Sequence, residues 1–167
     1  MTETYGISHG GQSAEELFRS LTGATRSLRA SSGDALLDGY PVEIKRATSA
    51  TLNQVRAVKY IPLVAYDERS GRWFVMPAHV VVREVSRKSR GQHTENPFES
   101  STLSLNRLQD YQVEAGELRS RVLDAIETSS RYPGLRAEMV RILEESRHLA
   151  TESVTWVGEV LRQLGLE

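Results

Sequence analysis

Asp34, Glu43 and Lys45 have residue types and a spacing that suit metal-assisted chemistry. Between them lies Asp38-Gly39, a dipeptide that favours a two-residue β-hairpin turn because both turn positions need positive φ. Counting outward from that turn places Asp34 directly opposite Glu43 on the neighbouring strand. Lys45 projects from the same face as Glu43, because strand side chains alternate. The hairpin is therefore predicted to gather two carboxylates and one ammonium group at a single point.

Two carboxylates placed side by side repel each other, so this arrangement favours a cation between them. Mg²⁺ is the natural candidate, since it takes one or two carboxylates from a protein and completes its octahedron with water and phosphate oxygens. Lys45 is suited to orient the attacking water or to stabilise charge on phosphorus. The predicted chemistry is metal-assisted hydrolysis of a phosphodiester. The alternative is that Glu43 and Lys45 form a solvated ion pair and that Asp34 is a turn residue.

The combination of Asp34 with Glu43-Ile44-Lys45, a short hairpin later, resembles the PD-(D/E)XK nuclease superfamily, which includes restriction endonucleases and Holliday-junction resolvases. Gly33 stands where that motif has its proline. The resemblance implies that Asp34 and Glu43 bind the metal, joined by the carbonyl of Ile44, and that Lys45 is the catalytic lysine. It also implies Mg²⁺ as the cofactor, with Mn²⁺ as a substitute, and DNA as the substrate.

Two further residues are candidates for supporting the site. The resemblance implies an acid from the first helix near the metal, and Glu15 is the match; the alternative is a solvated carboxylate favoured by the helix dipole. It also implies a polar residue on the helix after the E-x-K triplet, and Gln54 is the match; the alternative is an ordinary exposed glutamine. The first helix is expected to begin at Ser13, because Ser13 and Glu16 have the spacing of a capping box.

Basic residues are concentrated between residues 69 and 90, where six arginines and lysines accompany one acid, Glu84. A formal net charge of -1 does not exclude DNA as a partner, because phosphate contacts need only a locally positive surface. The polar segment 86–101 is long enough to suggest a loop that grips DNA. The residues predicted to contact DNA are Arg46, Arg83, Arg87, Lys88 and Arg90.

The elements around the hairpin predict an α/β fold. A weak first strand is expected over 25–31, and two buried strands are expected over 63–66 and 72–76. Leu52, Val55 and Val58 have helical spacing, which predicts a helix that packs across the sheet. The apolar run 78–85 fits a strand or a helix equally well. The resemblance implies that these elements form a restriction endonuclease-like mixed β-sheet core flanked by helices.

Beyond Tyr111, apolar residues recur at helical spacing and predict two or three amphipathic helices. We expect a nuclease-like α/β core with a basic loop over 1–110 and a helical extension over 111–167. The extension is expected either to cover the core or to pair two copies as a homodimer.

Composition limits the class of protein. The chain has 167 residues, of which 39% are hydrophobic and 26% are charged, as in ordinary soluble domains. There is no cysteine, so disulfides and thiolate metal sites are excluded. The N-terminal sequence does not fit a signal peptide, and no apolar run approaches the length of a membrane span, so we expect a cytoplasmic protein without a membrane partner.

The sequence thus predicts an Mg²⁺-dependent endodeoxyribonuclease that acts in restriction of foreign DNA or in junction or repair cleavage. A first alternative is a nuclease-like fold that binds nucleic acid or a nuclease partner without cutting. A second alternative is that the helical extension is the functional part, as an oligomerisation module, and that the α/β half is its scaffold.

Overall fold

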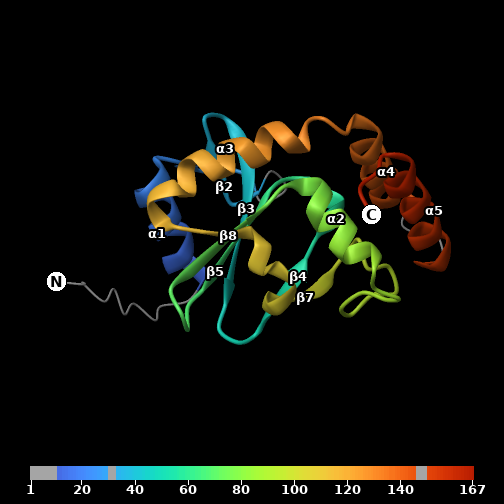
Figure 1. The fold of residues 1–167 in the computed structure, drawn as a ribbon, viewed down its shortest axis with the longest axis horizontal. Helices are drawn as coiled ribbons and strands as arrows, with labels where there is room; N and C mark the ends of the chain where they lie inside the picture. Colours follow the sequence, from blue (N-terminus) through green and yellow to red (C-terminus); the bar gives the residue numbers. More distant parts are fainter. Residues whose placement is uncertain (1–10, 30–32, 146–149) are drawn as a thin grey trace.

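In a computed structural model of the chain, a mixed β-sheet carries helices on both of its faces (Figure 1). The structure describes residues 11–29, 33–145 and 150–167, so most of the predicted N-terminal lead-in lies outside the described residues. Among these described residues, six strands form the main sheet in the order β1-β2-β3-β5-β6-β8, and β4 pairs with β7 in a separate ribbon. Neighbouring strands are antiparallel except for the parallel pair β3 and β5.

The strands are β1 (Thr25–Arg26), β2 (Ala35–Leu37), β3 (Tyr40–Ala47), β4 (Thr51–Val55), β5 (Leu63–Asp67), β6 (Arg72–Met76), β7 (Ser101–Ser104) and β8 (Gln112–Val113). The α-helices are α1 (Gly11–Thr22), α2 (Ala78–Ser86), α3 (Leu118–Ser129), α4 (Pro133–Glu144) and α5 (Ala150–Gln163). Short 3₁₀ segments connect them: η2 (Ala57–Lys59), η3 (Leu105–Tyr111) and η4 (Ala115–Glu117). Within the described ranges, no helix is both long and apolar enough to cross a membrane.

The predicted hairpin forms from β2 and β3. Its register pairs Leu37 with Tyr40 and continues to Ala35 opposite Val42, as the turn position requires. Asp38 and Gly39 have φ values of 49° and 85°, so both turn residues adopt the left-handed conformation that this hairpin type needs.

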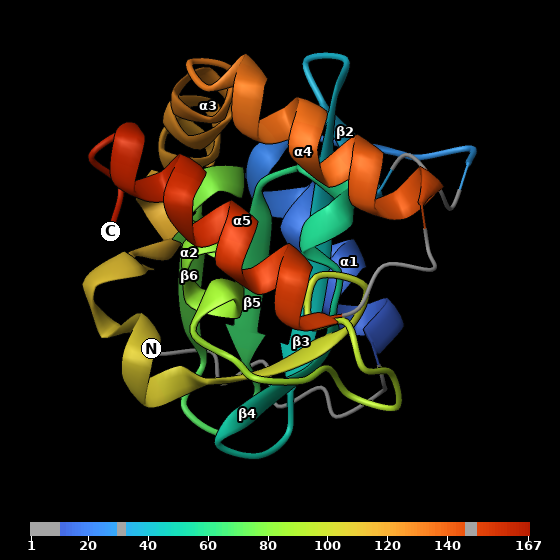
Figure 2. The same ribbon diagram turned by 90° about the vertical axis from the view of Figure 1, so that its right-hand side faces the viewer.

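Alternation along the strands of the sheet creates two cores. On one face, Val42 and Ile44 of β3 pack with α1 and α3. On the other face, Ala47, Leu63 and Ala65 pack with α2, α4 and α5. Figure 1 shows these two groups of helices on opposite sides of the sheet. In Figure 2, α4 and α5 lie side by side next to α2. The predicted helical extension therefore covers the core on both faces.

The segment 51–60 is a strand followed by a 3₁₀ turn, so the helix predicted there is wrong. Leu52 pairs with Leu103 and Val55 pairs with Ser101, so β4 carries one more residue than β7 between these pairs. This is a β-bulge, and Gln54 in it has a φ of 53°. Because of the bulge, Leu52 and Val55 are both buried on the same face of β4 although they are three positions apart in the sequence. This spacing is the one expected for a helix.

Other predicted elements are confirmed. The strands β5 and β6 extend the predicted ranges by at most one residue, and the C-terminal pattern forms three helices. The run 78–85, which fitted either state, is helical. Its valines at 80, 81, 82 and 85 are all buried, because α2 packs against both the sheet side and α5. A helix that is apolar on most sides gives no clear period in the sequence.

Two boundaries differ from the prediction. The helix α1 begins at Gly11, so Ser13 lies inside the helix and not at its start; helix ends commonly shift by two residues without changing the packed face. The first strand ends at Arg26 because β2 offers partners only to Thr25 and Arg26, and Leu28 is 96% exposed. The predicted remainder of that strand, at residues 30 and 31, lies outside the described residues.

Candidate active site

The hairpin places Asp34 next to the backbone of Ile44 and Lys45 next to Glu43, whereas the predicted pairing of Asp34 directly opposite Glu43 is not part of the strand register. Asp34 immediately precedes β2, and its Oδ2 accepts a hydrogen bond of 2.8 Å from the backbone N–H of Ile44. Lys45 lies on the same face of β3 as Glu43, and its Nζ is 3.6 Å from Glu43 Oε1. Asp34 therefore contacts Ile44, the middle residue of the triplet Glu43-Ile44-Lys45. Lys45 contacts Glu43, the first residue of the same triplet.

Gly33 precedes Asp34, at the position where the nuclease motif has its proline, and its backbone conformation directs the chain into the site. The residue has a φ of 85°, which proline cannot adopt, and a Cβ atom there would lie 2.8 Å from the carbonyl oxygen of Val42. The same carbonyl accepts a 2.9 Å hydrogen bond from the N–H of Asp34. The regular register thus stops at Ala35, and the Asp34 carboxylate turns towards the backbone of β3.

A third carboxylate, that of Glu15 on α1, lies near the other two. Its pKa is raised, first by partial burial of the side chain and then by the negative charge of Asp34, with a smaller contribution from Glu43. Arg19 and Arg26 oppose this increase in pKa. Glu15 is therefore a partly buried acid whose pKa responds to the charges of both predicted metal ligands. It lies in the second turn of α1 and not at the N-terminus of the helix.

Lys59 is a second lysine of the site, and local sequence patterns did not assign it to this position. Its Nζ is 2.9 Å from Glu43 Oε2, and its side chain is 16% exposed. Each oxygen of Glu43 therefore has its own ammonium partner, Lys45 on one side and Lys59 on the other. The contact depends on η2, where Tyr60 ends the turn with a left-handed φ of 46°. Lys59 lies in the segment 51–60, for which the sequence predicted a helix.

The chemistry of these donors fits a hard divalent cation with a largely aqueous coordination shell. Asp34 and Glu43 supply carboxylate oxygens, and the carbonyl of Ile44 points to the same edge of β3 as its N–H. Mg²⁺ takes one or two carboxylates and keeps several waters. Over residues 11–29, 33–145 and 150–167, no group of three or more histidine or acidic side chains is arranged to hold a metal. These residues fit a metal site with few protein ligands and several water ligands, and not a site in which the protein supplies every ligand.

The other predicted site residues lie further out. Gln54 is exposed on the bulge of β4, and its backbone N–H donates to Gln92 Oε1 over 2.7 Å. Arg46 projects from the opposite face of β3 to Glu43, and its guanidinium is 3.0 Å from Glu68. Neither side chain is shown in contact with the Asp34–Glu43 pair.

The predicted DNA-binding segment contains a charge cluster organised by Glu84, which we call the Glu84 cluster. The Glu84 side chain is 4% exposed and pairs with Arg83, Arg87 and Arg107 at 3.4, 3.0 and 3.3 Å. Arg83 also hydrogen-bonds to the hydroxyl of Tyr111. Arg107 lies on η3, outside the basic segment, so no sequence pattern indicated its contact with Glu84. Arg83 and Arg87, like Arg46, are predicted phosphate contacts that already have an ion-pair partner in the protein.

Lys88 and Arg90 complete the predicted basic segment. Lys88 lines a cavity of about 110 Å³ together with Arg87 and Arg107. Arg90 is exposed in the segment that follows α2. The part of this segment nearest the Glu84 cluster therefore carries an excess of positive charge.

Comparison with known proteins assigns no family to the chain. No protein-family model matches it, and no curated protein matches its sequence. Its chemistry is therefore inferred from the residues of the site.

Proposed function

We propose that this protein is a metal-dependent endodeoxyribonuclease with a restriction endonuclease-like fold. The observation that supports this best is the convergence of the Asp34 carboxylate, the backbone of Ile44 and the Glu43–Lys45 pair at one end of a β-hairpin. Glu15 supports it further, because its pKa is raised by burial and then by the nearby charge of Asp34, a repulsion that a bound cation would relieve.

Each residue of the site has a role in this proposal. Asp34, Glu43 and the carbonyl of Ile44 would hold Mg²⁺, which when bound acidifies a water molecule and neutralises phosphate charge. Lys45 donates hydrogen bonds to the attacking water or to a phosphoryl oxygen as negative charge develops there. Lys59 fixes the orientation of the Glu43 carboxylate and adds positive charge for the phosphate. The water oxygen bonds to phosphorus, and the bond between phosphorus and the leaving oxygen breaks.

Cleavage of both strands of a duplex needs two such sites, which we propose a homodimer supplies. The outward side of α4 and α5 has exposed apolar residues that such a contact would cover. They are Val140, Leu143, Trp156 and Leu164. A two-fold contact of this surface with itself would place two copies of the site on one DNA molecule.

Cleavage of supercoiled plasmid in Mg²⁺ and in EDTA tests the proposal. We expect the wild-type protein to cut in Mg²⁺ and not in EDTA, and Lys45→Ala to cut at least about a hundredfold more slowly, because a charge-stabilising donor is lost. The matched control is Arg121→Ala, which removes a cation from an exposed ion pair with Glu117 at the start of α3 and should cut like wild type. Equal cutting by Lys45→Ala and wild type would refute the proposed role of this site.

A second candidate is a nuclease-like fold that binds DNA without cutting it. Both oxygens of Glu43 have lysine partners, an arrangement that neutralises the carboxylate without a metal. For this candidate we expect DNA binding in a gel-shift assay, no heat of Mg²⁺ or Mn²⁺ binding by calorimetry, and no cleavage with either ion. Metal-dependent cleavage that is lost in Lys45→Ala would exclude it.

A further inference from the structure

A second hollow lies beside the candidate active site, at the start of β3 and just before β5. It has a volume of about 420 Å³, and its lining includes three tyrosines, three prolines and one arginine. The residues that matter here are Tyr40, Pro41, Tyr60, Pro62, Tyr132 and Arg136. We call it the tyrosine pocket. Its size lies in the range of small-molecule sites, roughly 300–1,000 Å³.

We propose that the tyrosine pocket receives an unpaired nucleobase of the DNA strand whose phosphate lies at the Asp34–Glu43 site. The inference rests on the proposed nuclease function and specifies its substrate: DNA with a base that is unpaired or easily extruded. Bases outside a duplex are held in proteins by stacking on aromatic rings and guanidinium planes. The pocket supplies both kinds of group.

The pocket and the candidate active site share their walls. Pro41 and Glu43 project from the same face of β3, two residues apart, which is about 7 Å along a strand. The carbonyl of Pro62 accepts a 3.0 Å hydrogen bond from the N–H of Glu43. Ile61, which also lines the pocket, packs closely against Gly33, next to Asp34. A distance of about 7 Å is roughly two base steps of one strand, so one short stretch of DNA reaches both places.

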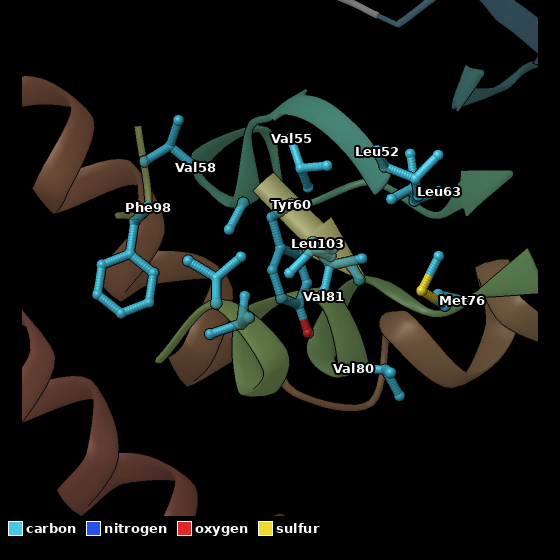
Figure 3. Packing of buried hydrophobic residues seen from close by; sticks show 14 of the residues in the cluster. Leu52, Val55, Val58, Tyr60, Leu63, Met76, Val80, Val81, Phe98 and Leu103 are labelled. Carbon is cyan, nitrogen blue, oxygen red and sulfur yellow. The ribbon is translucent and has the colours of Figure 1, made fainter. Parts of the chain in front are cut away.

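The exposed ring of Tyr40 and the partly exposed ring of Tyr132 can stack on a base, and Tyr60 forms a floor that is fixed before any ligand arrives. Tyr60 is 3% exposed, and its hydroxyl donates a 3.0 Å hydrogen bond to the carbonyl of Ser129. Figure 3 shows its ring within the core close to Leu103 and Val81. Tyr132 is partly exposed, and its ring centroid is 4.7 Å from that of the buried His79. A preorganised wall loses little conformational freedom on binding.

The charge at the pocket favours a nucleotide over an uncharged apolar ligand. The guanidinium carbon of Arg136 is 5.7 Å from the centre of the Tyr60 ring, and the Arg136 side chain is exposed. Arg136 can therefore contact a phosphate while the base occupies the apolar interior. Burial, the largest cause, raises the pKa of Tyr60 to about 12, so this wall stays neutral at physiological pH. An apolar segment of a second copy would use the rings but not the arginine.

Binding to short duplexes in EDTA, where no metal supports cleavage, tests the pocket separately from the chemistry. One duplex is fully paired, and the other has a single 2-aminopurine opposite an abasic site. We expect the protein to bind the second duplex about five to a hundred times more tightly, the range expected for stacking of one base on aromatic side chains. We also expect the 2-aminopurine fluorescence to decrease as the base stacks on tyrosine.

A pocket-filling variant and a matched control make the test specific. Ser130 is exposed and lines the pocket, so Ser130→Trp should fill it without disturbing the core and should abolish the preference for the unpaired base. Ser120→Trp adds the same side chain at an exposed position of α3 away from the pocket and should retain the preference. Circular dichroism of both variants checks that they are folded.

Several results would overturn the inference. Equal affinity of the wild type for the two duplexes would do so, and so would an unchanged preference in Ser130→Trp. A dimer in sedimentation that only Ser130→Trp dissociates would assign the pocket to a second copy. Plasmid cleavage without the binding preference would refute the pocket and leave the nuclease proposal intact, whereas the preference without any cleavage would refute the nuclease proposal alone.

Discussion

Glu43 and Glu84 are both buried carboxylates surrounded by cations, yet their surroundings differ in kind. Glu43 is 8% exposed and pairs with two ammonium groups, those of Lys45 and Lys59. Glu84 is 5% exposed and pairs with three guanidinium groups. The decisive difference is the presence of like charge: Glu15 lies near Asp34 and Glu43, and its pKa is raised first by burial and then by the charges of Asp34 and Glu43.

The contrast separates a structural charge cluster from a candidate site. The Glu84 carboxylate and its arginines satisfy one another, which fixes the C-terminal end of α2 against η3. Near Glu43, the charge of Asp34 opposes ionisation of Glu15, a repulsion that a bound cation would relieve. A partly buried acid with a raised pKa beside like charges is typical of functional sites. Four predictions test this interpretation, from the largest expected effect to the smallest.

The largest effect is expected on cleavage. Glu43→Gln keeps the shape of the side chain but removes a proposed metal ligand, so the cleavage rate should fall at least about a thousandfold, or about 4 kcal/mol of transition-state stabilisation. Glu84→Gln should stay within about tenfold of wild type, because its charge lies outside the proposed chemistry. Single-turnover plasmid cleavage measures both. A loss in Glu84→Gln as large as that in Glu43→Gln would end the distinction between the two carboxylates.

The free energy of unfolding should change more on substitution of Glu84 than on substitution of Glu43, the opposite order to that for cleavage. Glu84→Ala leaves three arginines without their carboxylate, so the free energy of unfolding should fall by about 3 kcal/mol. Glu43→Ala should lower it by about 1 kcal/mol or less, because relief of repulsion from Asp34 and Glu15 offsets the loss of two lysine pairs. Urea unfolding monitored by circular dichroism gives both values. A larger loss in Glu43→Ala than in Glu84→Ala would contradict the idea that the Glu43 region is held under repulsion.

A smaller effect concerns Arg87, which belongs to the Glu84 cluster but is 47% exposed and has N–H donors to spare. If it also contacts phosphate, Arg87→Ala should reduce the salt dependence of DNA binding by about 0.9 in the slope of log K against log salt. Fluorescence anisotropy at several salt concentrations measures the slope, with Arg121→Ala as the control. An unchanged slope would make Arg87 purely structural.

The smallest effect is a change in one pKa. Asp34→Asn removes a charge that raises the pKa of Glu15, so this pKa should move back towards its ordinary value of 4.5, although burial keeps part of the shift. Because the pKa is raised in the folded state, Glu15 lowers stability as pH rises through the window above 4.5, and Asp34→Asn should weaken this dependence. Carbon-13 NMR titration of the Glu15 carboxyl measures the pKa. A higher pKa in the variant would contradict the assigned cause.

The central hairpin was predictable because one dipeptide determines its register. Asp38-Gly39 fixes the turn, and the side-chain alternation of β3 then places Glu43 and Lys45 on one face. The position of Asp34 was predicted less exactly, because Gly33 changes the direction of the chain just before the regular ladder. The turn depends only on neighbouring residues, so a short stretch of sequence is enough to predict it.

The contacts that sequence reasoning missed all depend on long-range geometry. The bulge at Gln54 turned a strand into an apparent helix, because its buried residues fall three apart. Lys59 reaches Glu43 only through the path of β4 and η2, and Arg107 reaches Glu84 from an element 23 residues away. No periodicity or motif encodes such contacts. The charges themselves were visible in the sequence, but their pairing was not.

The contact at the tip of the hairpin forms late during synthesis of the chain. Asp38 at the turn is held by two hydrogen bonds of 2.8 and 2.9 Å from Arg119 of α3. Arg119 also donates to the carbonyl of Thr22 at the end of α1. A nascent chain that has not yet reached residue 119 lacks this clamp, although all the proposed catalytic groups have already been translated. The hairpin that carries the proposed site therefore gains this contact only after residue 119 has left the ribosome.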